Sequence, residues 1–150
     1  MALSARDAAD RVEQLIILTE RLTEVVARQA DCFEARRPLD AAAMTEEAAR
    51  LANLYRHESG RVRADPGLVS AAPADRRQAL IKATEAFDVE LGRHGRAVTA
   101  AKVVTEGLVR SIAEEVASQR EQLSGYGPGA RISAAAYGAA GTAITLNQRA

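Results

Sequence analysis

Residues 12–33 read VEQLIILTERLTEVVARQADCF, and this stretch decides the fold class. One side of it recurs at steps of three and four residues, through Val12, Leu15, Ile16, Thr19, Leu22, Val25, Val26, Gln29 and Phe33. That period is typical of an amphipathic α-helix whose charged residues lie on the opposite face. Ser4 and Asp7 supply a capping signal before the stripe, and Pro38 stops a helix beyond it. The sequence therefore predicts a helix over about residues 5–36.

A second apolar stripe predicts a second helix. It consists of Met44, Ala48, Leu51, Leu54 and Tyr55. Asp40 can cap this helix, and the turn signal Asp65-Pro66-Gly67 ends it. We expect a helix over about residues 40–64, followed by a turn in which Gly67 permits a positive φ angle.

The longest stripe predicts a third helix, over about residues 75–122, with Asp75 as its cap. Its members are Leu80, Thr84, Phe87, Leu91, His94, Val98, Ala101, Thr105, Leu108, Ile112 and Val116. Their spacing is close to the 3.5-residue repeat of a coiled coil. Gly92 and Gly95 each cost about 1 kcal/mol in a helix interior. Either a close approach of a second helix or a local bend would account for them.

The helical pattern stops after Leu123, where glycine and proline become frequent. We therefore divide the chain into a helical domain, residues 1–124, and a flexible Gly/Ala-rich tail, residues 125–150. No run of alternating residues predicts a strand. The expected fold is all-α: an elongated antiparallel three-helix bundle or coiled-coil hairpin with a very long third helix.

Composition restricts the partners of the chain. Among its 150 residues, 20 basic side chains balance 20 acidic ones. Because phosphate binding relies on an excess of basic charge, we expect no nucleic-acid partner. The longest strongly apolar cluster, residues 15–18, is too short to span a bilayer, so we expect no stable membrane insertion and a cytoplasmic location.

Few residues could carry out chemistry. The chain holds one cysteine, Cys32, and two histidines, His57 and His94. The position three residues before each histidine is a leucine rather than the glutamate that a di-metal bundle requires. No Cys/His cluster predicts a zinc site, and no glycine-rich loop joins a strand to a helix. We expect no catalytic, cofactor-binding or metal site, and therefore no enzyme.

Two alternatives to a simple binding protein stay open. His94 lies on a helix beside Arg93 and Arg96, as in a histidine phosphotransfer bundle. That family usually has lysine and glycine at the third and fourth positions after the histidine, where this chain has Ala97 and Val98. The second alternative is a structural coiled-coil assembly subunit, with which a homodimer is compatible.

The layout of the chain resembles that of FlgN-type flagellar export chaperones. The stretch LIILTERLTEVV, residues 15–26, is similar to the opening helix of that family, and a second helix and a very long third helix follow. The motif YGPG, residues 126–129, stands where the family often closes its third helix. The resemblance implies a cytoplasmic chaperone that binds the termini of hook-associated proteins and delivers them to the type III export apparatus.

Apolar residues near the end of the third helix and in the tail are the candidate partner-binding residues. Those on the helix are Leu108, Ile112, Val116 and Leu123, and those in the tail are Tyr126, Tyr137, Ile144 and Leu146. Small residues keep such a tail flexible when it is free, while its apolar side chains can dock in a complex. The tail can therefore supply anchors for a client, and a terminus without a role is the alternative.

Overall fold

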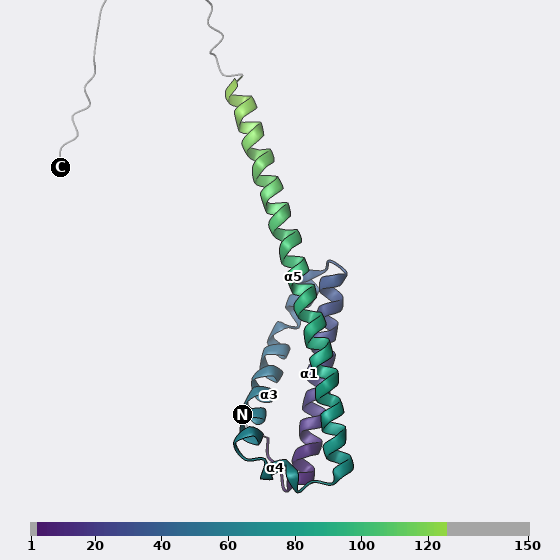
Figure 1. The fold of residues 1–150 in the computed structure, drawn as a ribbon. Coiled ribbons are helices and arrows are strands. Elements are labelled where there is room, and N and C mark those ends of the chain that lie inside the picture. The colour runs from purple at the N-terminus through teal and green to yellow at the C-terminus, as the bar shows by residue number, and fades with distance from the viewer. Residues whose placement is uncertain (1–2, 126–150) are drawn as a thin grey trace, which may run out of the picture. The chain divides into compact units, whose positions relative to one another are not determined.

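The computed structural model describes residues 3–125. Within this range the chain forms helices and no strand, which confirms the all-α class (Figure 1). The helices are α1 (Ala8–Glu34), α2 (Pro38–Ala43), α3 (Thr45–Ala64), α4 (Gly67–Ser70) and α5 (Ala74–Gly125). The very long last helix is confirmed as well. The predicted tail, apart from Gly125, lies outside the described residues.

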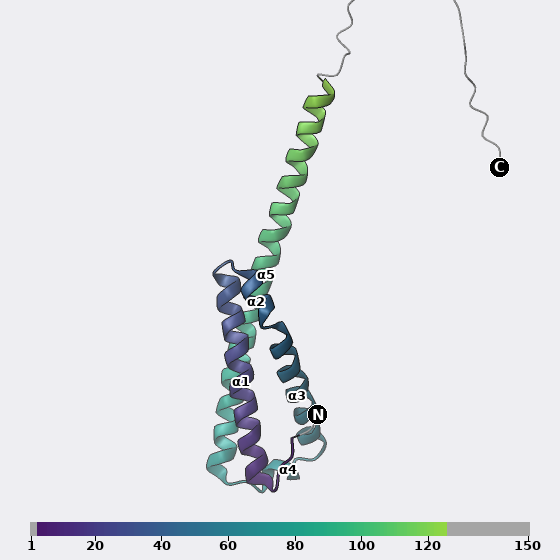
Figure 2. The same ribbon diagram turned by 180° about the vertical axis from the view of Figure 1, so that it is seen from behind.

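Residues up to Val109 form one compact unit, and a second unit begins at Arg110. In the first unit α1 is the central helix and packs against α2, α3 and α4. Both views show α1 running beside α5, with α3 in the opposite direction (Figures 1 and 2). In the second unit the described residues, 110–125, belong to helix α5.

The first stripe of the sequence forms the core. Its members from Val12 to Gln29 are all buried, and Phe33 is half-buried. The larger core cluster consists of Leu18, Leu22, Val25, Val26, Leu51 and Phe87. The rings of Tyr55 and Phe87 meet there with their centroids 5.2 Å apart, which joins α3 to α5.

Three predicted caps are wrong. Asp75 lies inside helix α5, which already begins at Ala74, so it is not the cap of that helix. Helix α1 starts later than expected because Asp7, and not Ser4, caps it: its Oδ1 accepts a hydrogen bond from Asp10 N at 2.8 Å. Asp40 does not cap a helix either, since Pro38 occupies the first position of α2 and starts it two residues earlier. Proline fits there because the first turn leaves its N–H groups without helical acceptors.

The predicted second helix is divided in two at Met44. In a continuous helix the carbonyl of Ala41 would accept from the N–H of Thr45. Instead, Met44 N donates to Ala41 O at 3.1 Å, and the side chain of Gln29 donates to the same oxygen at 3.2 Å. The buried amide of Gln29 thus accompanies a tightened turn that separates α2 from α3.

Gly67 does not use the positive φ that glycine permits. Asp65 Oδ1 accepts from Gly67 N at 3.0 Å, and a Cβ on Gly67 would lie 2.9 Å from that oxygen. A side chain at this position would therefore displace the Asp65 carboxylate from its hydrogen bond to Gly67 N. The positive φ occurs instead at Arg36, with a value of 58°.

The account of close helix approach at Gly95 is wrong. A Cβ built there meets nothing within 4 Å, and one on Gly92 meets only the end of the Arg96 side chain at 3.5 Å. Helix α5 has room for a side chain at both positions.

Candidate partner-binding surface

The four candidate residues on helix α5 are exposed. In the first unit Leu108 is 60% exposed, and in the second unit Ile112, Val116 and Leu123 are 55%, 43% and 74% exposed. Successive spacings of four, four and seven residues place them along one face of an α-helix. A large apolar side chain exposed singly is ordinary, whereas a row of them on one helix indicates an interaction surface. The remaining candidates, Tyr126, Tyr137, Ile144 and Leu146, lie outside the described residues.

The sequence prediction missed three exposed valines of α5. Val103, Val104 and Val109 are 63%, 56% and 62% exposed. They fall between the three- and four-residue steps of the predicted stripe and so were not assigned to it. The consecutive pairs Val103-Val104 and Leu108-Val109 are the available signal. With about 3.6 residues per turn, Val104 and Val109 flank the row, whereas Val103 lies on the opposite side of the helix.

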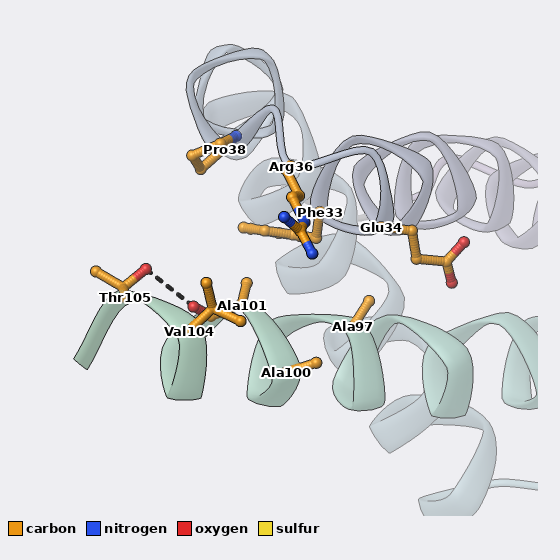
Figure 3. Close-up of a pocket in the computed structure, with 9 residues that line it drawn as sticks. All are labelled: Phe33, Glu34, Arg36, Pro38, Ala97, Ala100, Ala101, Val104 and Thr105. Atoms are coloured by element: carbon orange, nitrogen blue, oxygen red, sulfur yellow. Dashed lines mark hydrogen bonds between the residues drawn. The ribbon is translucent and has the colours of Figure 1, made fainter. Parts of the chain in front are cut away.

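A cavity of about 350 Å³ lies where α1 ends beside α5, within the first unit (Figure 3). We call it the α1-end notch. Its wall on α5 is Ala97, Ala100, Ala101, Val104 and Thr105, and its other wall is Phe33, Glu34, Arg36 and Pro38. Apart from Glu34, Arg36 and Thr105, the lining side chains are apolar. The sequence prediction missed this notch, because it forms between residues far apart in the chain.

His94 lines a second cavity, of about 390 Å³, between α3 and α5 over α1. Its ring stands edge-on to Phe33, with centroids 5.9 Å apart. Burial lowers the pKa of His94, since an apolar environment disfavours the charged imidazolium. His94 is thus a half-buried histidine packed against the edge of the core.

Arg93, beside His94, is already engaged by carboxylates. Its guanidinium contacts Glu34, Asp31 and Glu90. The hydrogen bonds that its guanidinium donates to Glu34, and then to Asp31, raise the pKa of Arg93. The cation that a phosphotransfer bundle would use to balance phosphate charge therefore holds α5 to the end of α1.

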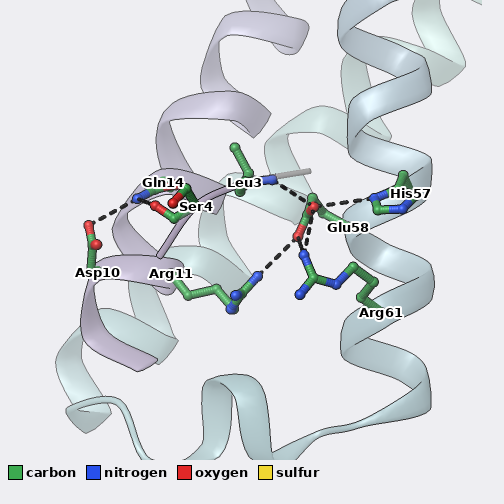
Figure 4. A network of polar contacts seen from close by, with 8 residues as sticks. All are labelled: Leu3, Ser4, Asp10, Arg11, Gln14, His57, Glu58 and Arg61. Atoms are coloured by element: carbon green, nitrogen blue, oxygen red, sulfur yellow. Dashed lines mark hydrogen bonds and ion pairs between the residues drawn. The ribbon is translucent and has the colours of Figure 1, made fainter. Parts of the chain in front are cut away.

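The most buried charge of the first unit is Glu58 on α3, whose side chain has no exposed surface (Figure 4). Its carboxylate accepts from Leu3 N at 2.9 Å, from Arg11 Nη1 at 3.1 Å and from Arg61 Nη1 at 3.2 Å. His57 Nδ1 lies 3.3 Å away. The network ties the N-terminal segment and α1 to α3. The sequence pattern did not predict this network, because a charged residue gives no signal of its burial.

Burial by itself would raise the pKa of Glu58. Hydrogen bonds from the backbone of Leu3 and from the side chains of His57 and Arg61 outweigh burial, and the net pKa is lowered. Glu58 is therefore an ionised carboxylate with a structural role. A buried ion pair with several donors keeps its charge because each oxygen is satisfied.

Within residues 3–125, no group of three or more histidine, cysteine or carboxylate side chains is placed to hold a metal ion. Of the helices in the same range, none combines the length with the apolar composition that crossing a bilayer demands.

These features define an all-α helical-bundle protein with an exposed apolar helix face. The chain is 57% identical to the flagellar basal-body protein FlbY of Caulobacter vibrioides, over an alignment of 151 positions that covers both proteins completely. The chain belongs to the family of this flagellar protein. No protein-family model matches the chain, and no solved structure matches it. The flagellar relationship expected from the sequence is thereby confirmed.

Proposed function

We propose that the chain is a cytoplasmic chaperone of flagellar export, which binds a hook-associated protein and delivers it to the type III export apparatus. The observation that supports this best is the row of exposed apolar side chains on α5. Membership of a flagellar protein family is consistent with it, and so is the resemblance of the sequence to FlgN-type chaperones.

The row on α5 fits an amphipathic segment of a client. Recognition of this kind lays the apolar face of one helix against an apolar surface, with anchors three and four residues apart. Each apolar side chain that becomes fully buried contributes about 1.5–3 kcal/mol. Ordering the client segment offsets part of this, so a few anchors give reversible binding. Reversibility suits a carrier that must release its client.

The proposed role involves no chemical step. Covering an apolar segment of the client is enough to keep it from aggregating, because such segments associate with one another when they are exposed. We accordingly propose that the chain is not an enzyme and uses no cofactor.

Purified hook-associated proteins of the same organism provide the test. Calorimetry should show saturable binding to the full-length chain, and light scattering should show that equimolar chain suppresses aggregation of the client. Absence of binding to every hook-associated protein would overturn the proposal. Stable self-association of the chain without a client, measured by sedimentation, would instead favour a structural coiled-coil subunit.

A further inference from the structure

The charged side chains at the α1-end notch differ in whether they have an ion-pair partner. Glu34 and Arg36 are the charged residues that line it, and the carboxylate of Glu34 is held by Arg93. Arg36 lines the notch, and its side chain has no hydrogen bond or ion pair with any other residue of the described chain. The mostly apolar notch therefore has one positively charged side chain, Arg36, that has no partner among the described residues.

The backbone at Arg36 adds a second observation. Helix α1 ends with Arg36 N donating to Phe33 O at 3.1 Å and Arg37 N donating to Cys32 O at 2.8 Å. This pattern is a Schellman motif, whose left-handed residue is usually glycine. Here an arginine takes that conformation, with φ at 58°. Residues with strained backbone angles are concentrated at functional sites, where the strain holds a side chain in the position that binding requires.

Figure 3 shows the result of this conformation. The Arg36 side chain runs from the turn toward α5 and lies beside the ring of Phe33, at the mouth of the notch. On the facing wall Ala97, Ala100 and Ala101 leave room for an incoming side chain. A site with mostly apolar walls and one charged group selects a ligand by shape and fixes its orientation by charge.

We propose that the α1-end notch binds a partner protein segment that inserts an apolar side chain and carries an aspartate or glutamate within one helical turn of it. The carboxylate pairs with the Arg36 guanidinium. This inference rests on the proposed function for the existence of a protein client, and it adds the chemistry of the client segment. Arginine suits the role because its planar group binds a carboxylate through two parallel hydrogen bonds.

Two synthetic helical peptides test the inference with the full-length protein. Both are labelled with fluorescein, are about 18 residues long, or five helical turns, and present leucine at three- and four-residue steps. One carries glutamate between the leucines and the other carries glutamine. Fluorescence anisotropy gives their dissociation constants for the parent chain and for Arg36→Gly, Arg36→Gln and Arg28→Gln. The last variant removes an exposed charge from the middle of α1 and serves as the matched control.

The parent chain and Arg28→Gln should bind the glutamate peptide about tenfold more tightly than the glutamine peptide, as expected for one charge-assisted pair. Both Arg36 variants should lose this preference. Arg36→Gly should also unfold at a temperature no lower than the parent, because glycine accepts a positive φ without strain. Loss of the preference then cannot be attributed to unfolding.

The inference is overturned if the parent shows no preference, or if the preference survives in both Arg36 variants. These outcomes are independent of the client measurements. If clients bind but the protein does not distinguish the two peptides, the chaperone proposal stands and the inference about the notch is wrong. A preference that depends on Arg36, without binding of any hook-associated protein, would support the notch and remove the chaperone proposal.

Discussion

At the scale of single residues, Glu58 makes the sharpest prediction. Glu58→Ala should lower the free energy of unfolding by about 3–5 kcal/mol, because it leaves the buried guanidinium of Arg11 without its carboxylate. Urea denaturation followed by circular dichroism measures the change. Glu47→Ala is the control, since it removes the exposed pair with Arg21 and should cost about 1 kcal/mol or less. Equal losses in the two variants would show that the Glu58 network does not hold α1 to α3.

His94 makes a prediction about pH. Its pKa is lowered in the folded chain, so the unfolded chain binds a proton at a higher pH than the folded one. The contribution of neutral His94 to the free energy of unfolding is therefore fully present above pH 6.5, the ordinary pKa of histidine. This contribution is lost as the pH falls from there toward the lowered pKa of the folded chain. His94→Gln should remove this decline from a plot of unfolding free energy against pH. A decline that is unchanged in the variant would contradict the burial of His94.

At the scale of elements, periodicity predicted the three principal helices and most of the buried face of α1. Periodicity failed where contacts between residues far apart in the chain determine the local structure. Gln29 reaches Ala41 O beside the break between α2 and α3, and Asp65 takes the space next to Gly67. Such contacts join residues whose proximity no local pattern records. For the same reason the α1-end notch was missed, whereas spacing alone predicted that Leu108, Ile112 and Val116 share one face of α5.

The glycines of α5 make the prediction at this scale. Gly95→Ala should raise the free energy of unfolding by about 0.5–1 kcal/mol, because alanine loses less conformational entropy in a helix. The added methyl group meets no atom within 4 Å. Thermal unfolding followed by circular dichroism is sufficient to measure it. Destabilisation would mean that a second helix does approach α5 closely there.

At the scale of the whole molecule, removal of the tail should affect binding but not stability. Every buried residue of the described chain lies between Arg11 and Ala97. Truncation after Ser124 should therefore leave the unfolding free energy within about 0.5 kcal/mol of that of the full chain. If the predicted tail anchors dock on a client, the same truncation should weaken binding by on the order of a hundredfold. Calorimetry on both forms gives the result. If the tail anchors the client, the truncated chain binds more weakly than the full chain; if the tail is passive, the two affinities are equal.

The central claim is that the exposed apolar face of α5 binds the client, and one calorimetric titration tests it directly. Ile112→Glu places a carboxylate on that face, and Ser118→Glu, six residues later, places the same charge on another face of the helix. Both sites are exposed, so both variants should fold like the parent. We expect Ile112→Glu to weaken binding of a hook-associated protein by about a hundredfold, and Ser118→Glu to leave it within about twofold. Equal affinities for the two variants would contradict the claim and place the binding surface elsewhere on the chain.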